Sequence, residues 1–259
     1  MSAPAQTHQG KVAIITGGSK GIGAATTLQL VAQGANVVFT YSNDTAAADA
    51  LVTKVHGLYP PIANAPPRVT AFKGDAAAVA DLKALVSKTL EVYGQIDILI
   101  LNAAIMPMHD LEHTTEASFD NTMALNVKGP YFLTQLVAPH LKAGSHIVFL
   151  STTLIAASTV TPAYLLYLTT KGAIEQMVRV ISKDLSRKGI SVNAVAPGPT
   201  GTELFYKDKP DAVLNMIKSF IPMGRLGTPE EIAQVIVWLS GDSSGWVSGQ
   251  IIRANGGMA

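Results

Sequence analysis

Cysteine is absent from the 259-residue chain. Its absence excludes disulfide bonds, catalytic thiolates and cysteine-based metal sites, and it is compatible with a reducing compartment. Charged residues are also few, at 14%, and the formal net charge is only +1, so the chain has no basic field for nucleic acid. We therefore expect a small-molecule partner.

Long apolar runs are missing too. No stretch approaches the roughly 18 continuous apolar residues of a membrane span, and Met1 to Gly10 has no apolar segment typical of a secretion signal. We expect no membrane role, and the cytoplasm is the default location.

What the chain does contain is 48% apolar residues, enough for a large core, in short runs that alternate with segments of helical period. Predicted strands cover residues 12–15, 36–41, 69–72, 97–101, 146–150, 191–195 and 250–253. Predicted helices cover residues 22–33, 45–55, 79–93, 115–142, 163–187 and 229–239. Strands joined through helices need crossover connections, so we expect a seven-stranded, mostly parallel sheet with helices on both faces. The simplest interpretation is a single doubly wound α/β domain over residues 1–259.

Two segments depart from this alternation. Residues 57–68 contain four prolines and predict an exposed loop. Residues 199–227 carry an apolar helical candidate, 212–220, between flanks rich in proline and glycine. Such a segment is typical of a mobile lid over a site.

Three glycines, Gly17, Gly21 and Gly23, follow the first predicted strand and open a helix. Glycines there let the backbone approach a pyrophosphate at the positive end of the helix. An ordinary glycine turn is the alternative, but the position after the first strand favours the phosphate loop.

The second predicted strand ends in Tyr41-Ser42-Asn43, without the carboxylate that NAD-preferring proteins place near the adenosine ribose. A 2′-phosphate would meet no repulsion at Tyr41, while Lys20 could add a positive charge and Ser42 and Asn43 hydrogen bonds. This favours NADPH over NADH. Alternatively, Lys20 is a solvated loop lysine and Tyr41 an ordinary strand residue, and the nearby Asp44 leaves NADH open.

Tyr167 and Lys171 lie four residues apart, and therefore on one face of a predicted helix. An ammonium beside a phenol stabilises the phenolate and lowers its pKa toward neutral pH. Tyr167 is therefore a candidate proton donor and acceptor of a nicotinamide-dependent oxidoreductase. An incidental exposed pair is the alternative.

Together these motifs resemble the short-chain dehydrogenase/reductase family along nearly the whole chain, from Lys11 to Gly257. Further residues match the family's landmarks in order and spacing: Thr16–Gly23 (the cofactor loop), Asp75 (adenine contact), Asn102-Ala103-Ala104 (the Asn-Ala-Gly turn), Asn126 (the helix Asn of the catalytic tetrad), and the segment from Pro197 to Thr202 (nicotinamide contact). The resemblance implies a Rossmann fold and a nicotinamide cofactor. The complete set of expected cofactor contacts is Gly17, Ser19, Lys20, Gly21, Ile22, Gly23, Tyr41, Ser42, Asn43, Asp75, Asn102, Ala103, Ala104, Tyr167, Lys171, Pro197, Gly198, Thr200 and Thr202.

The resemblance also implies catalytic roles. Lys171 would stabilise the tyrosinate and bind the nicotinamide ribose. Asn126 would hold a water that links Lys171 to solvent, although a buried Asn that satisfies a backbone kink is the alternative.

The family's catalytic serine usually stands about 13 residues before the tyrosine, where this chain has Leu154. The nearby hydroxyls are those of Ser151, Thr152 and Thr153. Alignment of the preceding strand end with the family favours Thr152, then Thr153, and the choice among the three stays open. Tyr164 competes with Tyr167 on spacing alone but has Leu168, not a lysine, four residues later.

The implied activity is NADPH-dependent reduction of a ketone, and the chain looks most like the branch of 3-oxoacyl-carrier-protein reductases and fungal naphthol reductases. A non-catalytic NADPH-binding regulator and an NAD-dependent alcohol dehydrogenase are the alternatives. The resemblance further implies a homotetramer, with a dimer as second choice. We expect no metal, because His109 to His113 lacks the glutamate that follows the first histidine in metalloprotease motifs.

Overall fold

The computed structural model describes residues 7–158, 160–206 and 209–259. Its strands form one parallel sheet in the order β3-β2-β1-β4-β5-β6-β7. They are β1 (Val12–Ile15), β2 (Asn36–Tyr41), β3 (Val69–Lys73), β4 (Ile98–Leu101), β5 (His146–Leu150), β6 (Ser191–Pro197) and β7 (Ile251–Ala254). The seven-stranded, doubly wound Rossmann fold expected from the sequence is confirmed.

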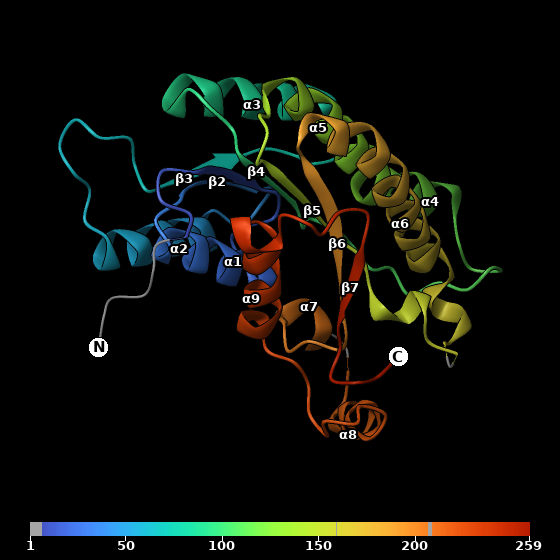
Figure 1. The fold of residues 1–259 in the computed structure, drawn as a ribbon. Coiled ribbons are helices and arrows are strands. Elements are labelled where there is room, and N and C mark those ends of the chain that lie inside the picture. The colour runs from blue at the N-terminus through green and yellow to red at the C-terminus, as the bar shows by residue number, and fades with distance from the viewer. Residues whose placement is uncertain (1–6, 159, 207–208) are drawn as a thin grey trace.

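Helices cover both faces of this sheet. The α-helices of the described residues are α1 (Gly21–Ala32), α2 (Thr45–Leu58), α3 (Val79–Tyr93), α4 (Glu116–Met123), α5 (Gly129–Val137), α6 (Leu165–Leu185), α7 (Glu203–Tyr206), α8 (Asp211–Ser219) and α9 (Pro229–Leu239). Figure 1 shows α1, α2 and α9 on one side of the sheet and α3, α5 and α6 on the other.

Alternation along the strands divides the core into two layers, because successive strand residues point to opposite faces. Ile15 and Phe39 pack with the layer of α1, α2 and α9, whereas Ile14, Val38 and Phe149 pack with that of α3, α5 and α6. All five side chains are at most 1% exposed. A sheet buried on both faces explains why the strands read as continuous apolar runs in the sequence.

Two predicted boundaries are wrong. Helix α2 continues to Leu58, so the first two residues of the predicted loop at 57–68 are helical. The helix expected over 115–142 is interrupted: α4 passes into a π-helical turn at Ala124–Lys128, α5 follows, and a 3-10 turn at Ala138–His140 ends the run. The π turn contains Asn126, whose contacts are described below.

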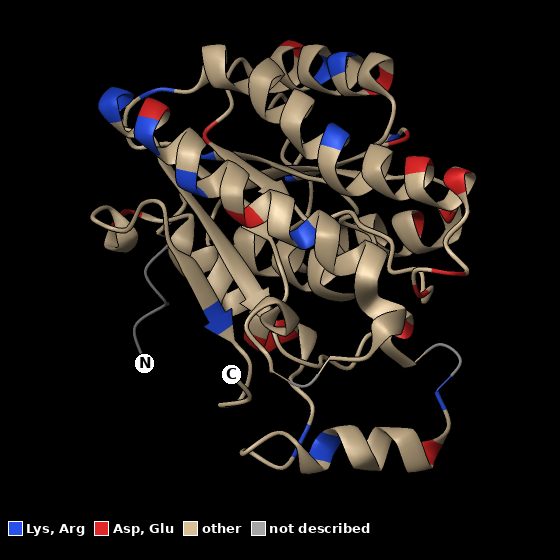
Figure 2. Ribbon diagram, turned by 90° about the vertical axis from the view of Figure 1, so that its right-hand side faces the viewer, with Lys and Arg blue, Asp and Glu red and all other residues tan. Residues whose placement is uncertain are grey.

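The segment 199–227 contains α7 and α8, and its Lys207 and Asp208 lie outside the described residues. The helix expected over 212–220 is present as α8. In Figures 1 and 2, α8 lies at the bottom, away from the sheet. Its first turn carries Asp211 and its last turn Lys218, which complement the helix dipole.

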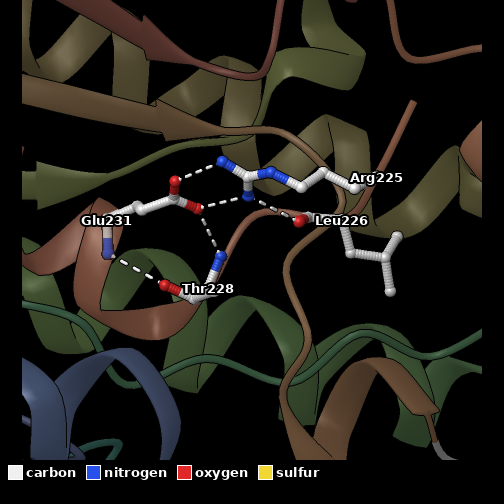
Figure 3. A network of polar contacts seen from close by, with 4 residues as sticks. All are labelled: Arg225, Leu226, Thr228 and Glu231. Carbon is white, nitrogen blue, oxygen red and sulfur yellow. Dashed lines mark hydrogen bonds and ion pairs between the residues drawn. The ribbon is translucent and has the colours of Figure 1, made fainter. Parts of the chain in front are cut away.

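The return of this segment into α9 is fixed by a polar network (Figure 3). Thr228 and Glu231 form a capping box, in which the Thr228 Oγ1 accepts from the Glu231 amide and the Glu231 carboxylate accepts from the Thr228 amide. Arg225 binds the same carboxylate through two nitrogens, at 2.5 and 2.8 Å. This ion pair and the amide of Thr228 lower the pKa of Glu231 to about 2.

Charged residues of both signs are spread over the helices in the view of Figure 2, with no large area of one sign. No helix within residues 7–158, 160–206 and 209–259 is long and apolar enough to cross a membrane.

Candidate active site

The residues expected to act together come from the carboxyl ends of β1, β4, β5 and β6. In the strand order, the chain winds one way from β1 to β3 and the other way from β4 onward. Ligands of doubly wound sheets bind at the carboxyl edge beside such a switch point. The fold therefore places the glycine loop, the Asn102 turn, the hydroxyls after β5 and the turn after β6 along one edge.

The glycine loop leads into α1 with its end open to a ligand. Lys20, the N-cap residue, has extended backbone and makes no side-chain cap, and the first turn holds no acidic residue. Gly17 and Gly21 have positive φ, +64° and +51°, which favour glycine. In the described chain the first turn of α1 thus keeps backbone N–H groups and dipole for an anion, and these residues fit a pyrophosphate.

Asn102 braces this loop from β4. Its Nδ2 donates to the carbonyl oxygens of Thr16 and Gly17, both at 3.0 Å. In return, the amides of Asn102 and Ala103 donate to the Thr16 Oγ1, both at 3.0 Å. The side chain of Asn102 is therefore committed to holding the loop, and Ala103 and Ala104 follow it as partly buried residues of the turn.

Lys20 is paired in this structure. Its Nζ lies 2.5 Å from the Asp44 Oδ2 and 3.1 Å from the Glu203 Oε2, and both contacts are exposed. The bonds to Asp44 and then Glu203 raise the pKa of Lys20, and its contact lowers the pKa of Asp44. A 2′-phosphate at Lys20 would have to compete with these two carboxylates.

The other expected adenosine contacts line the ends of β2 and β3. Tyr41 is partly buried, while Ser42, Asn43 and Asp75 are exposed. The Asp75 Oδ1 accepts from the amide of Ala77 at 2.9 Å. All four remain accessible at the same sheet edge.

Tyr167 and Lys171 lie together on α6, and the Lys171 Nζ is 5.6 Å from the centre of the Tyr167 ring. Lys171 is 4% exposed and donates to the Leu150 carbonyl at 2.7 Å. Burial lowers the pKa of Lys171 to about 8. It raises the pKa of Tyr167 to about 12, with a hydrogen bond to Thr152 acting in the opposite direction. The expectation of a Tyr167 pKa lowered toward neutral pH is wrong, because desolvation of the phenolate outweighs the effect of Thr152.

The structure separates the three candidate hydroxyls by their partners. The Ser151 Oγ donates to the Glu175 Oε1 at 2.7 Å. The Thr153 Oγ1 accepts from the Asn255 Nδ2 at 2.7 Å. The Thr152 Oγ1 accepts from the Leu154 amide at 3.4 Å, and among the three residues Thr152 is the one that lowers the pKa of Tyr167. Thr152 as the catalytic hydroxyl stays a prediction.

Asn126 is buried in the π turn. Its Oδ1 accepts from the Ile105 amide at 2.9 Å, and its Nδ2 donates to the Ile105 carbonyl at 2.8 Å and to the Thr170 Oγ1 at 3.1 Å. These contacts match the kink alternative, and none of them reaches Lys171.

The turn after β6 lies against both the glycine loop and the C-terminal segment. A Cβ on Gly21 would stand 3.1 Å from the Thr202 Cγ2, and one on Gly198 would stand 2.7 Å from the Asn255 Cα. The Thr200 Oγ1 donates to the Gly198 carbonyl at 2.9 Å. The Thr202 Oγ1 accepts from the Phe205 amide at 3.1 Å, and within the described residues its own proton stays available to a ligand beside α1. Pro197, the last residue of β6, is partly buried.

Comparisons with known proteins point to one family. A family model described as "Enoyl-(Acyl carrier protein) reductase" matches residues 17–259. A short chain dehydrogenase/reductase of Cryptosporiopsis sp. is 34% identical over 261 residues, covering 96% of each chain. The chain belongs to the short-chain dehydrogenase/reductase family. A short-chain dehydrogenase of Burkholderia cenocepacia, solved in complex with NADP, is 30% identical with a TM-score of 0.89, covering 97% of this chain and 99% of that one. The relative named NADPH-dependent aldehyde reductase 2, chloroplastic, of Arabidopsis thaliana is 34% identical over 268 residues, covering 99% of this chain and 97% of its own.

Two polar residues of this short-chain dehydrogenase/reductase escaped the sequence analysis. Glu175 holds Ser151, and its only sequence signal is its place eight residues after Tyr167 on the same helix face. Asn255, near the C-terminus, donates to the Thr153 hydroxyl, and no local sequence pattern predicts this contact. Within the described ranges, no group of three or more His, Asp or Glu side chains could hold a metal.

Proposed function

We propose that the protein is an NADPH-dependent reductase that transfers a hydride to a ketone carbonyl and gives an alcohol. The observation that carries the proposal is the cluster after β5: the Nζ of the buried Lys171 lies 5.6 Å from the centre of the Tyr167 ring, and Thr152 is near enough to lower the pKa of that phenol. The uncapped end of α1 lies along the same sheet edge.

For the cofactor, the first turn of α1 would hold the pyrophosphate, and Thr202 beside it would supply a hydroxyl. Lys20, Ser42 and Asn43 would meet the 2′-phosphate, with no carboxylate at Tyr41 to repel it. The relative named as NADPH-dependent and the structural neighbour solved with NADP support this choice.

When bound, NADPH supplies the hydride that goes to the carbonyl carbon. The Thr152 hydroxyl donates a hydrogen bond to the carbonyl oxygen and so orients the ketone. With a pKa raised to about 12, Tyr167 is protonated at neutral pH and is ready to donate its proton to the same oxygen. The Lys171 ammonium then stabilises the tyrosinate that remains, at the moment when the phenol charge develops.

Around this site we propose one domain over residues 1–259, with residues 199–227 as a substrate lid. The lid carries apolar side chains that are 47% to 69% exposed, Leu204, Tyr206, Met216, Phe220 and Met223. An apolar ketone is the ligand that such side chains would cover. Cytoplasmic location stays a prediction.

For assembly we propose a homotetramer, with a dimer as second choice. The edge strand β7 follows Trp246, which is fully exposed at 101%, and an exposed apolar edge favours burial against another copy. Light scattering should give the mass of four chains, and the mass of one chain would contradict both assemblies.

The test of function follows the absorbance of NADPH, and separately NADH, with purified protein and a panel of ketones, β-ketoesters and quinones. Tyr167→Phe is the control, because it removes only the proton donor. We expect NADPH-dependent turnover that is lost in the variant. Tight NADPH binding without turnover would indicate a regulator, and preferential use of NADH would contradict the role of Lys20.

A further inference from the structure

Three consecutive residues at the end of β5 each face a different turn of α6, and two of them bond to it. The Leu150 carbonyl accepts from the Lys171 Nζ at 2.7 Å, and the Ser151 hydroxyl donates to the Glu175 Oε1 at 2.7 Å. Thr152, the next residue, lies close enough to the Tyr167 phenol to lower its pKa. The strand end therefore lies against α6 through two hydrogen bonds and this third contact.

The spacing on α6 explains how this is possible. Tyr167, Lys171 and Glu175 stand at i, i+4 and i+8, which places them in one row along the helix. Two of these contacts belong to the reacting groups of the proposed mechanism. The contact of Glu175 is the one that touches neither substrate nor cofactor in that mechanism.

Ser151 is well placed to anchor the strand end. It is 4% exposed, and its backbone amide donates to the Val195 carbonyl at 2.8 Å. Ser151 is thus bonded to β6 through its backbone amide and to α6 through its side chain. A hydroxyl bound to a carboxylate forms a charge-assisted hydrogen bond, which is shorter and stronger than a neutral one.

The neighbours of Glu175 on the buried side of α6 are apolar. Ile174 and Val178 are at most 2% exposed and belong to the core. An apolar residue at 175 could extend that packing but would leave the buried Ser151 hydroxyl without its acceptor. A carboxylate here is therefore suited to fixing geometry more than to adding apolar burial.

We infer that Glu175 is a positioning residue: through Ser151 it holds the end of β5 in the register that presents the Thr152 hydroxyl to Tyr167 and the Leu150 carbonyl to Lys171. This inference rests on the proposed reductase function. Glu175 acts on the reaction only through the residues it places.

The test compares Glu175→Leu, which removes the acceptor, with Glu175→Gln, which keeps an amide oxygen for the Ser151 hydroxyl. Gln176→Ala, at an exposed neighbour on α6, is the control. We expect Glu175→Leu to lower kcat about 10- to 100-fold, because misplacement of reacting groups by about 1 Å costs up to that much. The KM for the ketone should change by less than about threefold, while Glu175→Gln and Gln176→Ala keep wild-type kcat within about the same factor.

A purely structural role predicts another pattern. It would lower the melting temperature of Glu175→Leu while the folded enzyme kept its kcat, and that result would overturn the inference. So would a Glu175→Gln enzyme as impaired as Glu175→Leu. Ser151→Ala should reproduce the kcat loss, and the double variant Ser151→Ala/Glu175→Leu should lose no more than the worse single variant, because both remove one bond. Losses that multiply in the double variant would also overturn it.

Failure of the proposed function is distinguishable from failure of this inference. If the wild-type protein reduces no ketone, crystal structures of wild type and Glu175→Leu still decide the matter. Displacement of Thr152 from Tyr167 and lengthening of the 2.7 Å contact between Leu150 and Lys171 support the inference. An unmoved strand end in Glu175→Leu overturns it.

Discussion

Gly23→Ala should disrupt the phosphate loop from inside. A Cβ at this position would lie 2.2 Å from the Gly17 carbonyl oxygen, 2.8 Å from the Asn102 Nδ2 and 2.9 Å from the Gly18 Cα. Ordinary van der Waals contact begins at 3.4 Å, so the Gly17 oxygen would have to move by more than about 1 Å. The same oxygen accepts a hydrogen bond from the Asn102 Nδ2, which the movement would break.

The cost has two measurable parts. Overpacking of this kind destabilises a protein by about 1–3 kcal/mol. Because the displaced backbone is the part expected to meet the pyrophosphate, the Kd for NADPH should rise at least about tenfold, which corresponds to about 1.4 kcal/mol.

Gly57→Ala is the matched control. Gly57 lies in α2, and a Cβ there would meet nothing within 4 Å. Alanine is favoured over glycine inside helices, so this variant should gain about 0.5–1 kcal/mol and bind NADPH as the wild type does.

The assay combines urea unfolding with a fluorescence titration of NADPH for the three proteins. A Gly23→Ala variant with wild-type stability and wild-type Kd would refute the reasoning. A variant that loses stability but binds NADPH normally would show that the loop geometry does not serve the cofactor.

Three further predictions follow from single contacts. In steady-state assays, Thr152→Ala should lower kcat about 100-fold and Thr152→Ser less than about tenfold, because serine keeps the hydroxyl; a larger loss in Thr153→Ala would contradict the assignment. Lys20→Ala should raise the Kd for NADPH about tenfold and leave the Kd for NADH unchanged, because only NADPH has the 2′-phosphate that Lys20 would bind. Equal weakening of NADPH and NADH binding would contradict this role of Lys20. Burial lowers the pKa of His146 to about 4, so its stabilising effect is complete above the ordinary value of about 6.5 and is lost as pH falls toward 4. Urea unfolding should show a drop of about 2 kcal/mol from this residue between pH 7 and pH 5, absent in His146→Gln.

The strands could be predicted because the strands of a sheet covered on both faces are short, continuous apolar runs in the sequence. Val12–Ile15 and residues 147–150 are buried, and each reads as an unbroken apolar run closed by polar residues. The sequence pattern predicts helices less well where tertiary contacts determine the backbone conformation. The π turn at Asn126 depends on hydrogen bonds to Ile105, 21 residues away, which no local period reveals.

The candidate site also has features that the sequence could predict and features that it could not. Spacing along the chain could place Tyr167 and Lys171 on one helix face, because that needs only helix geometry. It could not give their pKa values, which depend on burial and on the Leu150 carbonyl that binds Lys171. Nor could it give the partners of the hydroxyls of residues 151–153, since Glu175 and Asn255 come from distant parts of the chain.

The most direct test of the central claim follows the hydride itself. NADPH carrying deuterium at C4, prepared as each of its two stereoisomers, is incubated with the protein and a ketone that it consumes, and the alcohol is analysed by mass spectrometry and NMR. We expect one stereoisomer to deliver its deuterium to the carbinol carbon, and Tyr167→Phe to give almost no alcohol. Alcohol without deuterium from either stereoisomer, or undiminished transfer in Tyr167→Phe, would contradict the account.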